Sequence, residues 1–204
     1  MAYEGIIDIS HWQKRPKLAA AMAAGFSAVI IKATQGISAV DGDFIANLAE
    51  ANANGFLVGA YHFGEPGQGL AQADFFLNTV QPTPKTLLAL DFERGGAGLM
   101  GVQDAVDFVT HIYQNLNRWP VIYGGADLKQ QLAGGGNPVL SNCPLWLAQY
   151  GPTAVLPAGW TNWTLWQFSD DNYNKPATPV PGVSPVDRDR FAGTAADLAA
   201  EWPF

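Results

Sequence analysis

The stretch Leu87–Glu93 reads LLALDFE, an apolar run that ends on two carboxylates separated by one residue. A short continuous apolar run of this kind is typical of a buried strand in a parallel sheet. Because side chains alternate along a strand, we expect Asp91 and Glu93 on one face, about 7 Å apart, and Phe92 on the other. Burial beside a like charge separates two carboxyl pKa values, so that one group can act as an acid while the other stays ionised. The alternative is a strand that ends in a solvated acidic turn.

Short apolar runs alternate with helical patterns on both sides of this stretch. The other strands that we expect are Gly5–Ile9, Ser27–Ala33, Phe56–Phe63, Pro120–Tyr123, Leu145–Gln149, Thr164–Phe168 and a short one within Val186–Phe191. Helices are predicted at Pro16–Ala24, around 44–51, around 70–80, and at Val102–Leu116, Ala126–Leu132 and Ala195–Glu201. After Leu132 only loops join the strands, and glycine and proline become frequent. With no linker, repeat or low-complexity tract, we expect one domain over residues 1–204.

Repeated β-α units that close into a parallel sheet imply either a barrel or a doubly wound sheet. Polar residues stand at the C-terminal ends of several predicted strands, namely Asp8, Lys32, Tyr61, Asp91 with Glu93, Tyr123 and Gln149. A β/α barrel keeps its active site at that end of its strands. The pattern therefore favours an α/β barrel over an open sheet.

Composition excludes several classes of protein. The 204 residues are 48% hydrophobic and 14% charged, with a formal net charge of −7 and no cluster of Lys or Arg. Such a chain is a poor partner for nucleic acid or an anionic membrane surface. The single cysteine, Cys143, excludes an intrachain disulfide framework and a Cys-based zinc site. No apolar stretch approaches the ~20 residues of a membrane span, and residues 1–5 do not resemble a signal peptide, so we expect a chain made in the cytoplasm or already processed.

Several local patterns have a structural and a chemical interpretation. Gly96–Gly101 matches G-x-G-x-x-G, but no acidic residue follows the next strand to hold a ribose, so a loop is favoured over a nucleotide site. Cys143 precedes a proline at the start of a strand and lacks an obvious His partner, which favours a buried thiol over a nucleophile. The three histidines show no metal-ligand spacing, and we expect His62 to be a hydrogen-bonded barrel residue and His111 to lie on a helix surface.

Tryptophan is concentrated in the loop-rich half of the chain. Four of the seven tryptophans fall within about twenty residues, at Trp146, Trp160, Trp163 and Trp166. Aromatic side chains dominate protein cores, and they also hold sugars through the apolar C–H faces of the rings. Both interpretations stay open from these residues alone.

The segment Gly5–Gln13, GIIDISHWQ, is the first of an ordered set. The set continues with Ala28–Thr34, Gly59–Phe63, Gln72–Phe76, Leu90–Glu93, Trp146–Tyr150 and Trp166–Ser169. With these segments the chain resembles the glycoside hydrolase family 25 lysozymes (N-acetylmuramidases), many of them phage or bacterial cell-wall lysins. The resemblance covers nearly the whole length, and its specificity lies in the order of the segments.

This resemblance implies a modified TIM-like (β/α) barrel with five β/α units followed by three strands joined by loops, which suits the change of rhythm after Leu132. It implies that Glu93 is the general acid and that Asp91 orients the 2-acetamido group of the substrate or a water. The other acidic residues of the implied site are Asp8 and Asp187, and the candidate sugar contacts are Lys32, Tyr61, Tyr123, Trp146 and Gln149. No metal or other cofactor is expected.

Two positions depart from the family pattern. Gln35 stands where the family often has Glu, which removes one acidic group. Asp189 stands where the family has Asn in an Asp-x-Asn-x-Phe pattern, which adds charge beside Asp187. Stereochemistry stays open, because carboxyl groups about 5–5.5 Å apart indicate a nucleophile and about 6.5–9.5 Å leave room for a water. A third possibility is substrate-assisted catalysis, in which the acetamido group of the substrate acts as the nucleophile. For an N-acetyl sugar beside an Asp-x-Glu pair, this possibility is favoured.

The expected activity is therefore cleavage of the β-1,4 bond between N-acetylmuramic acid and N-acetylglucosamine in bacterial peptidoglycan. We expect a monomeric phage endolysin that is made in the host cytoplasm and acts on the cell wall after release. One alternative is an N-acetylglucosaminidase or chitinase-like hydrolase that uses the same acetamido chemistry. The other, from a different class, is a non-catalytic glycan-binding barrel, which retention of both Asp91 and Glu93 disfavours.

Overall fold

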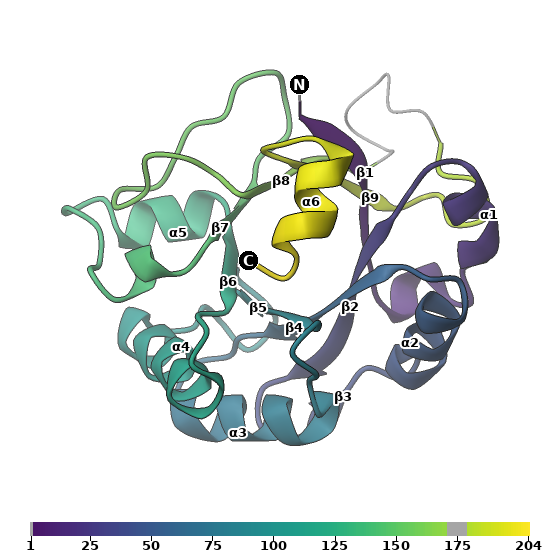
Figure 1. Ribbon diagram of the computed structural model, residues 1–204. Coiled ribbons are helices and arrows are strands. Elements are labelled where there is room, and N and C mark those ends of the chain that lie inside the picture. Colours follow the sequence, from purple (N-terminus) through teal and green to yellow (C-terminus); the bar gives the residue numbers. More distant parts are fainter. Residues whose placement is uncertain (1, 171–178) are drawn as a thin grey trace.

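The computed structural model of the chain describes residues 2–170 and 179–204 (Figure 1). The strands are β1 (Tyr3–Ile9), β2 (Ala28–Gln35), β3 (Ala39–Val40), β4 (Leu57–Phe63), β5 (Leu87–Asp91), β6 (Val121–Gly124), β7 (Leu145–Ala148), β8 (Leu165–Ser169) and β9 (Asp187–Phe191). The helices are α1 (Leu18–Ala23), α2 (Phe44–Ala53), α3 (Gly69–Val80), α4 (Val102–Leu116), α5 (Ala126–Gln131) and α6 (Ala195–Glu201), with short 3-10 helices η1 (His11–Gln13) and η2 (Leu140–Asn142).

All the strands belong to one sheet that closes on itself. Their order is β1-β9-β8-β7-β6-β5-β4-β2-β3, and β1 also pairs with β2, so the sheet forms a barrel with β3 as an extra strand outside the ring. Helices α1 to α5 lie around the outside of the barrel (Figure 1). The expected modified β/α barrel is confirmed, with its β/α units followed by β7, β8 and β9, between which the described residues form no helix.

One strand of the barrel runs against the others. β9 is antiparallel to both of its neighbours, β1 and β8, whereas β1, β2, β4, β5, β6, β7 and β8 pair in parallel. The chain leaves β8 at its C-terminal end and enters β9 from that same end of the barrel. The first residue of β9, Asp187, therefore lies level with the last residues of the parallel strands.

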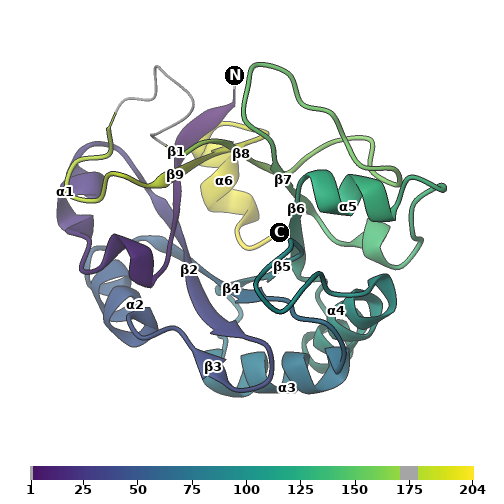
Figure 2. The same cartoon turned by 180° about the vertical axis from the view of Figure 1, so that it is seen from behind.

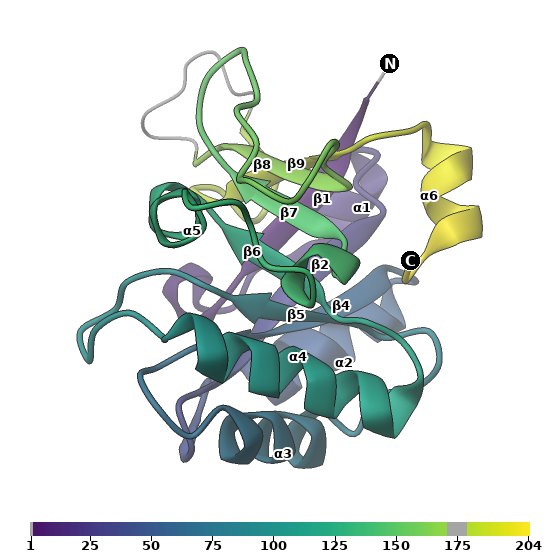
Figure 3. The same cartoon turned by 90° about the vertical axis from the view of Figure 1, so that its left-hand side faces the viewer.

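The inside of the barrel is a packed core that α6 closes at one end. Alternate strand residues such as Ile30, Leu87 and Phe191 point inward and are nearly or fully buried. Leu198 of α6 and the following Trp202 pack into the same cluster. Thr194 and Asp197 form a capping box at the start of α6, where two backbone N–H groups gain side-chain acceptors. Figure 1 looks along the barrel with α6 in front of its opening, and Figure 3 shows α6 at one end from the side.

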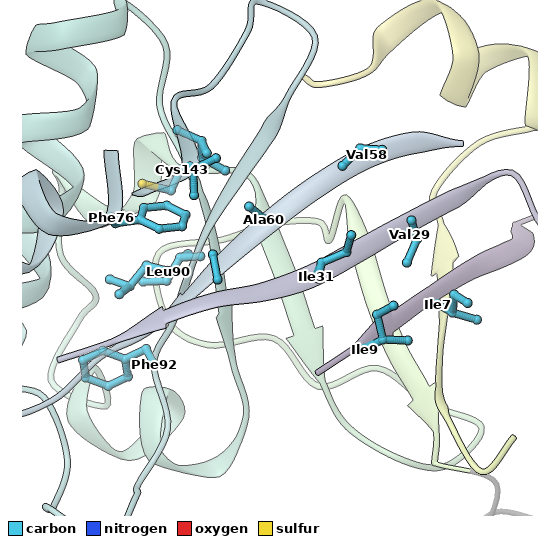
Figure 4. Close-up of a cluster of buried hydrophobic side chains, with 14 of the residues drawn as sticks. Ile7, Ile9, Val29, Ile31, Val58, Ala60, Phe76, Leu90, Phe92 and Cys143 are labelled. Carbon is cyan, nitrogen blue, oxygen red and sulfur yellow. The ribbon is translucent and has the colours of Figure 1, made fainter. Parts of the chain in front are cut away.

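The other strand faces pack against the surrounding helices (Figure 4). Ile7, Ile31, Leu90 and Phe92 belong to this outer layer. Cys143 also lies in it, and burial raises the pKa of its thiol, which keeps it protonated and unreactive. The expectation of a buried structural thiol agrees with this placement.

The observed elements differ from the expected ones mainly at their ends. β2 continues to Gln35, two residues beyond the expected end at Ala33, because Thr34 and Gln35 pair with β3 after a turn at Gly36. Gly36 has φ of +54°, the left-handed region that glycine adopts readily. β3 was not expected, because two exposed residues carry no periodicity. Among the described residues, no helix combines the length and apolar character needed to cross a membrane.

Candidate active site

A pocket of about 220 Å³ opens at the end of the barrel opposite α6, the end that faces the viewer in Figure 2. Its lining residues are Asp8, Ile9, Ser10, Trp12, Gln13, Lys32, Tyr61, Phe63, Asp91, Glu93, Tyr123, Trp146, Gln167 and Asp187. A site that encloses a whole drug-sized ligand measures roughly 300–1,000 Å³. The pocket is therefore of a size to hold one unit of a polymeric ligand whose other units lie outside it.

Asp91 and Glu93 both line this pocket, and Phe92 between them packs in the outer layer. Asp91 ends β5 and is almost fully buried, and its Oδ1 atom has no hydrogen-bond partner among the described residues. Burial and the charge of Glu93 raise the pKa of Asp91 well above its usual value, and burial also raises the pKa of Glu93. The pair therefore retains a proton at a pH where exposed carboxyl groups have lost theirs.

Lys32 is the basic side chain among the described pocket residues. Its Nζ lies 4.8 Å from the centre of the Phe63 ring and donates a hydrogen bond of 2.9 Å to Gln35 Oε1. Its charge lowers the pKa of both Asp91 and Glu93, against the effect of burial. Gln35 in turn donates from Nε2 to Glu65 Oε1 at 2.8 Å. The carboxylate of Glu65 is thus linked to Lys32 through the Gln35 side chain. A Glu at position 35 would instead place a carboxylate next to Lys32 directly.

Three aromatic side chains stand together at the pocket. Trp146 lies edge-on to Tyr123, with ring centres 4.8 Å apart, and to Tyr61 at 6.4 Å. Trp146 is only 2% exposed, so its ring forms part of the floor of the pocket and not part of its rim. Burial, followed by the nearby carboxylates, raises the pKa of both tyrosines well above their usual value. The two phenols are therefore hydrogen-bond donors at neutral pH.

Asp8 and Gln167 join the two sides of the pocket. Gln167 donates from Nε2 to Asp8 Oδ2 at 2.9 Å and accepts from the Tyr123 hydroxyl at 2.9 Å. Gln167 lies in the segment Trp166–Ser169 that carries the family resemblance, but it is not among the predicted site residues. Its place at the end of β8, level with Asp8 and Tyr123, is the signal that could have found it.

Asp187 lines the pocket from β9, the strand that runs antiparallel to its neighbours. It stands directly across from Asp8 in the antiparallel pairing of β9 with β1. The structure thus gathers eight of the nine predicted site residues at one pocket: Asp8, Lys32, Tyr61, Asp91, Glu93, Tyr123, Trp146 and Asp187.

Gln149 is the predicted site residue that lies outside this pocket. It lines an adjoining hollow together with Glu93, Tyr123, Gln167 and Tyr150. Its side chain accepts a hydrogen bond from Lys129 Nζ and donates to the carbonyl oxygen of Thr153. Gln149 therefore holds the loop after β7, and a contact with sugar stays a prediction. Glu93 borders both hollows, which puts it at their junction.

The tryptophan cluster divides between core and site. Trp160, Trp163 and Trp166 pack against the outer layer, and Trp160 Nε1 donates to the Cys143 carbonyl oxygen at 2.8 Å. Of the four clustered tryptophans, only Trp146 lines the pocket. The exposed aromatic side chain at the rim of the pocket is instead Trp12 of η1, which is 78% exposed. Trp12 is not among the predicted site residues.

Histidines take structural positions. His62 is fully buried, lies 2.7 Å from Thr34 Oγ1 and 2.9 Å from Gln72 Oε1, and stacks on Phe108. Burial lowers its pKa to about 4, so it is neutral at pH 7. His111 pairs with Asp74 at 2.6 Å between α4 and α3. Within residues 2–170 and 179–204, no group of three or more His, Cys, Asp or Glu side chains has a metal-binding arrangement.

Comparison with known families gives a direct match. Residues 7–176 match the sequence model of the family described as glycosyl hydrolases family 25. The chain belongs to this family. Family 25 membership makes it a glycoside hydrolase, and the matched segment includes Asp8, Asp91 and Glu93 but ends before β9.

Individual lysozymes and muramidases resemble the chain over most of its length. Lysozyme M1 of Streptomyces globisporus is 34% identical over 95% of this chain and 69% of its own. An N,O-diacetylmuramidase of Chalaropsis sp. is 31% identical over 80% of this chain and 86% of its own. The crystal structure of a bacterial lysozyme from Streptomyces coelicolor has a TM-score of 0.83 and 34% identity, covering 95% of this chain and 94% of that one. The similarity to this lysozyme structure thus covers more of the chain than the match to the family model.

Proposed function

We propose that the protein is a peptidoglycan hydrolase of the lysozyme type, which cleaves the β-1,4 bond between N-acetylmuramic acid and N-acetylglucosamine. In this proposal Glu93 is the general acid and Asp91 assists the reaction. The substrate is the glycan of the bacterial cell wall, and no cofactor takes part. The names of two relatives, a lysozyme and a diacetylmuramidase, support the substrate class.

The observation that carries the proposal is the placement of Asp91 and Glu93 side by side at the pocket of a family 25 barrel. Asp91 Oδ1 is buried and has no partner among the described residues. A buried carboxylate oxygen needs a donor, and the N–H of a 2-acetamido group is a donor of the right kind. Glu93 is less buried and borders the adjoining hollow, as suits an acid that protonates an oxygen between two sugars.

The proposed reaction is substrate-assisted. Glu93 gives its proton to the glycosidic oxygen, and the bond between that oxygen and the anomeric carbon breaks. The acetamido carbonyl oxygen forms a bond to the anomeric carbon while Asp91 accepts the acetamido N–H. Water then attacks the anomeric carbon and gives a proton to Glu93, while the bond between the acetamido oxygen and the anomeric carbon breaks and the acetamido carbonyl re-forms. This restores the enzyme and leaves a hydroxyl group on each product.

The other predicted residues surround this centre. Asp8 and Asp187 supply negative charge that favours the positive charge developing on the sugar ring. Lys32 and Tyr61 offer hydrogen-bond donors to the sugar, and Trp146 forms the apolar floor. The Tyr123 hydroxyl donates to Gln167, so its oxygen is the group that can accept a hydrogen bond from the sugar. We keep Gln149 as a contact for the sugar in the adjoining hollow.

The bond that is cut identifies the activity. Purified peptidoglycan is digested with the wild type and with Glu93→Gln, the products are reduced with borohydride, and the new ends are identified by mass spectrometry. We expect muramicitol ends from the wild type and none from the variant. Glu201→Gln is the matched control, because Glu201 lies exposed on α6, at the end of the barrel opposite the pocket (Figure 3). Equal melting temperatures of the three proteins would exclude misfolding as the cause.

Other outcomes assign the alternatives. Glucosaminitol ends would identify an N-acetylglucosaminidase or chitinase-like enzyme. Binding of peptidoglycan without cleavage by the wild type would identify a non-catalytic glycan-binding barrel, and the proposed acid role of Glu93 would then be wrong.

The route to the wall and the oligomeric state are further proposals. We propose that the protein acts as a monomer and reaches the wall from the cytoplasm, as a phage endolysin does. Bacteria that express it should then lyse when their inner membrane is permeabilised, and stay intact before that. Lysis without permeabilisation would contradict this route, and sedimentation of the purified protein tests the monomer.

A further inference from the structure

β9 brings a second carboxyl group beneath the pocket. Asp187 and Asp189 lie two residues apart on the strand and so share its inward face. Asp187 lines the pocket, whereas Asp189 lies one layer deeper and is completely buried. A fully buried carboxylate is costly unless it is paired or neutralised. Asp189 therefore needs either a cation or a proton.

Hydrogen bonds hold Asp189 and Asp8 from opposite sides. Trp146 Nε1 donates to Asp189 Oδ1 at 2.7 Å, and Gln167 Nε2 donates to Asp8 Oδ2 at 2.9 Å. No N–H or hydroxyl group of the described residues donates to Asp189 Oδ2, which is buried. The carboxyl group of Asp8 is the neighbour with which Asp189 interacts. Two carboxylates accept hydrogen bonds only, so a bond between them requires that one carries a proton.

Burial, together with the neighbouring carboxylates, favours retention of that proton. The charged or titratable side chains around the pair are Lys32 of β2, Tyr61 of β4, Asp91 of β5 with Glu93, Tyr123 of β6, and Asp187 and Arg188 of β9. β7 and β8 contribute the neutral Trp146 and Gln167. Burial raises the pKa of Asp189 to about 8, and burial followed by Asp189 raises the pKa of Asp8 well above its usual value. Arg188 acts in the opposite direction on Asp189.

We propose that Asp8 and Asp189 share one proton, and that Asp189 is thereby a positioning residue for the glycosidase reaction. The shared proton fixes the Asp8 carboxyl group at the pocket wall. Because Gln167 links Asp8 to the Tyr123 hydroxyl, the same proton also sets the direction of the Tyr123 donor. This inference rests on the proposed function only in taking this pocket as the place where sugar reacts.

The first test observes the proton directly. The protein is labelled with ¹³C at the aspartate side-chain carboxyl carbon, and its resonances are followed by NMR from pH 4 to 10. An ordinary aspartate titrates near 3.9. We expect the resonances assigned to Asp8 and Asp189 to titrate together and to stay partly protonated at neutral pH, and the Asp189 resonance should be absent in Asp189→Asn. Titration of both assigned resonances near pH 4 in the wild type would overturn the proposal.

The second test uses stability. The folded pair holds a proton that the unfolded chain has released above about pH 4, so the pair destabilises the fold increasingly as pH rises from about 4 to 8. In Asp189→Asn an amide can donate to Asp8 at every pH. The stability gain of the variant over the wild type should therefore grow between pH 4 and pH 8. A gain that is constant over this range would contradict a shared proton. Asp107→Asn, on the outer helix α4, is the matched control.

The third test separates positioning from a merely structural role. Asp189→Leu removes both hydrogen bonds, and we expect kcat to fall at least tenfold while KM changes less. Asp189→Asn should restore kcat to within a few fold of the wild type at pH 6. Full activity of Asp189→Leu would overturn the positioning role. The reducing ends of the products report independently on which bond is cut, so failure here leaves the proposed function standing.

Discussion

The ammonium group of Lys32 is held by Gln35, whose side-chain oxygen accepts its hydrogen bond at 2.9 Å. The two residues are close in sequence, on the end of β2 that borders the pocket. This contact keeps a positive charge near Asp91 and Glu93. The acid–base balance of the site therefore depends on a neutral residue three positions along the strand.

Lys32→Met should shift the acidic limb of the pH–activity profile to higher pH. Lys32 lowers the pKa of Asp91 and Glu93, so its loss raises both values. Asp91 then loses its charge at a higher pH, and activity at acidic pH falls with it. The measurement is kcat/KM against pH, with Lys85→Met in an exposed loop as control. An unchanged acidic limb would show that Lys32 does not act on the pair.

Gln35→Glu should destabilise the protein unless Glu65 is changed as well. Gln35 donates to Glu65 at 2.8 Å, and a carboxylate at position 35 would meet the Glu65 carboxylate instead. Loss of this bond should lower the free energy of unfolding by about 1 kcal/mol. The double variant Gln35→Glu/Glu65→Gln restores a donor and an acceptor, so we expect it to recover most of that loss in urea unfolding. Additive losses in the double variant would contradict the coupling.

Trp12→Ala should weaken binding of glycan chains without affecting the fold. Trp12 is 78% exposed at the pocket rim, so its indole contributes little to the core. Loss of a stacking platform of this kind should raise KM roughly fivefold, equivalent to about 1 kcal/mol, with kcat nearly unchanged. Steady-state kinetics on soluble peptidoglycan fragments measures both constants.

Trp160→Phe is the control for that variant. It removes the hydrogen bond to the Cys143 carbonyl oxygen in the outer layer, so stability should fall by about 1–2 kcal/mol while KM stays the same. The reverse pattern, in which Trp160 controls KM and Trp12 does not, would place the sugar platform elsewhere.

His62 should make the protein sensitive to acid. Burial lowers the pKa of His62 to about 4, below its usual 6.5, so the unfolded state binds the proton first. Stability from this group is present above about pH 6.5 and is lost as pH falls towards 4, by on the order of 3 kcal/mol. Urea midpoints of the wild type between pH 7 and 4 should therefore fall more steeply than those of His62→Gln. Parallel curves for the two proteins would contradict a neutral buried histidine.

Sequence periodicity by itself determined the repeated units of the barrel. Apolar runs and 3.6-residue spacing depend on neighbours along the chain, so the expected strands and helices lie within a few residues of the observed ones. α6 was predicted with its observed ends, Ala195 and Glu201, and the structure shows that the residues that cap it, Thr194 and Asp197, are also local. Strand alternation also predicts that Asp91 and Glu93 face the same side, and both line one pocket although β5 ends at Asp91.

Only the tertiary structure decided which distant residues meet. The reversal of β9 places Asp187 level with the ends of the parallel strands, across from Asp8 of β1, and puts Asp189 one layer beneath it. The loop position of Gln149, the exposure of Trp12 and the bridging place of Gln167 likewise depend on how the barrel closes. Local sequence determines which helices and strands form, because each hydrophobic pattern spans only a few neighbouring residues. Burial and hydrogen bonding across the closed sheet determine the chemistry, because they join residues that are far apart in the chain, such as Asp8 and Asp189, which are 181 positions apart.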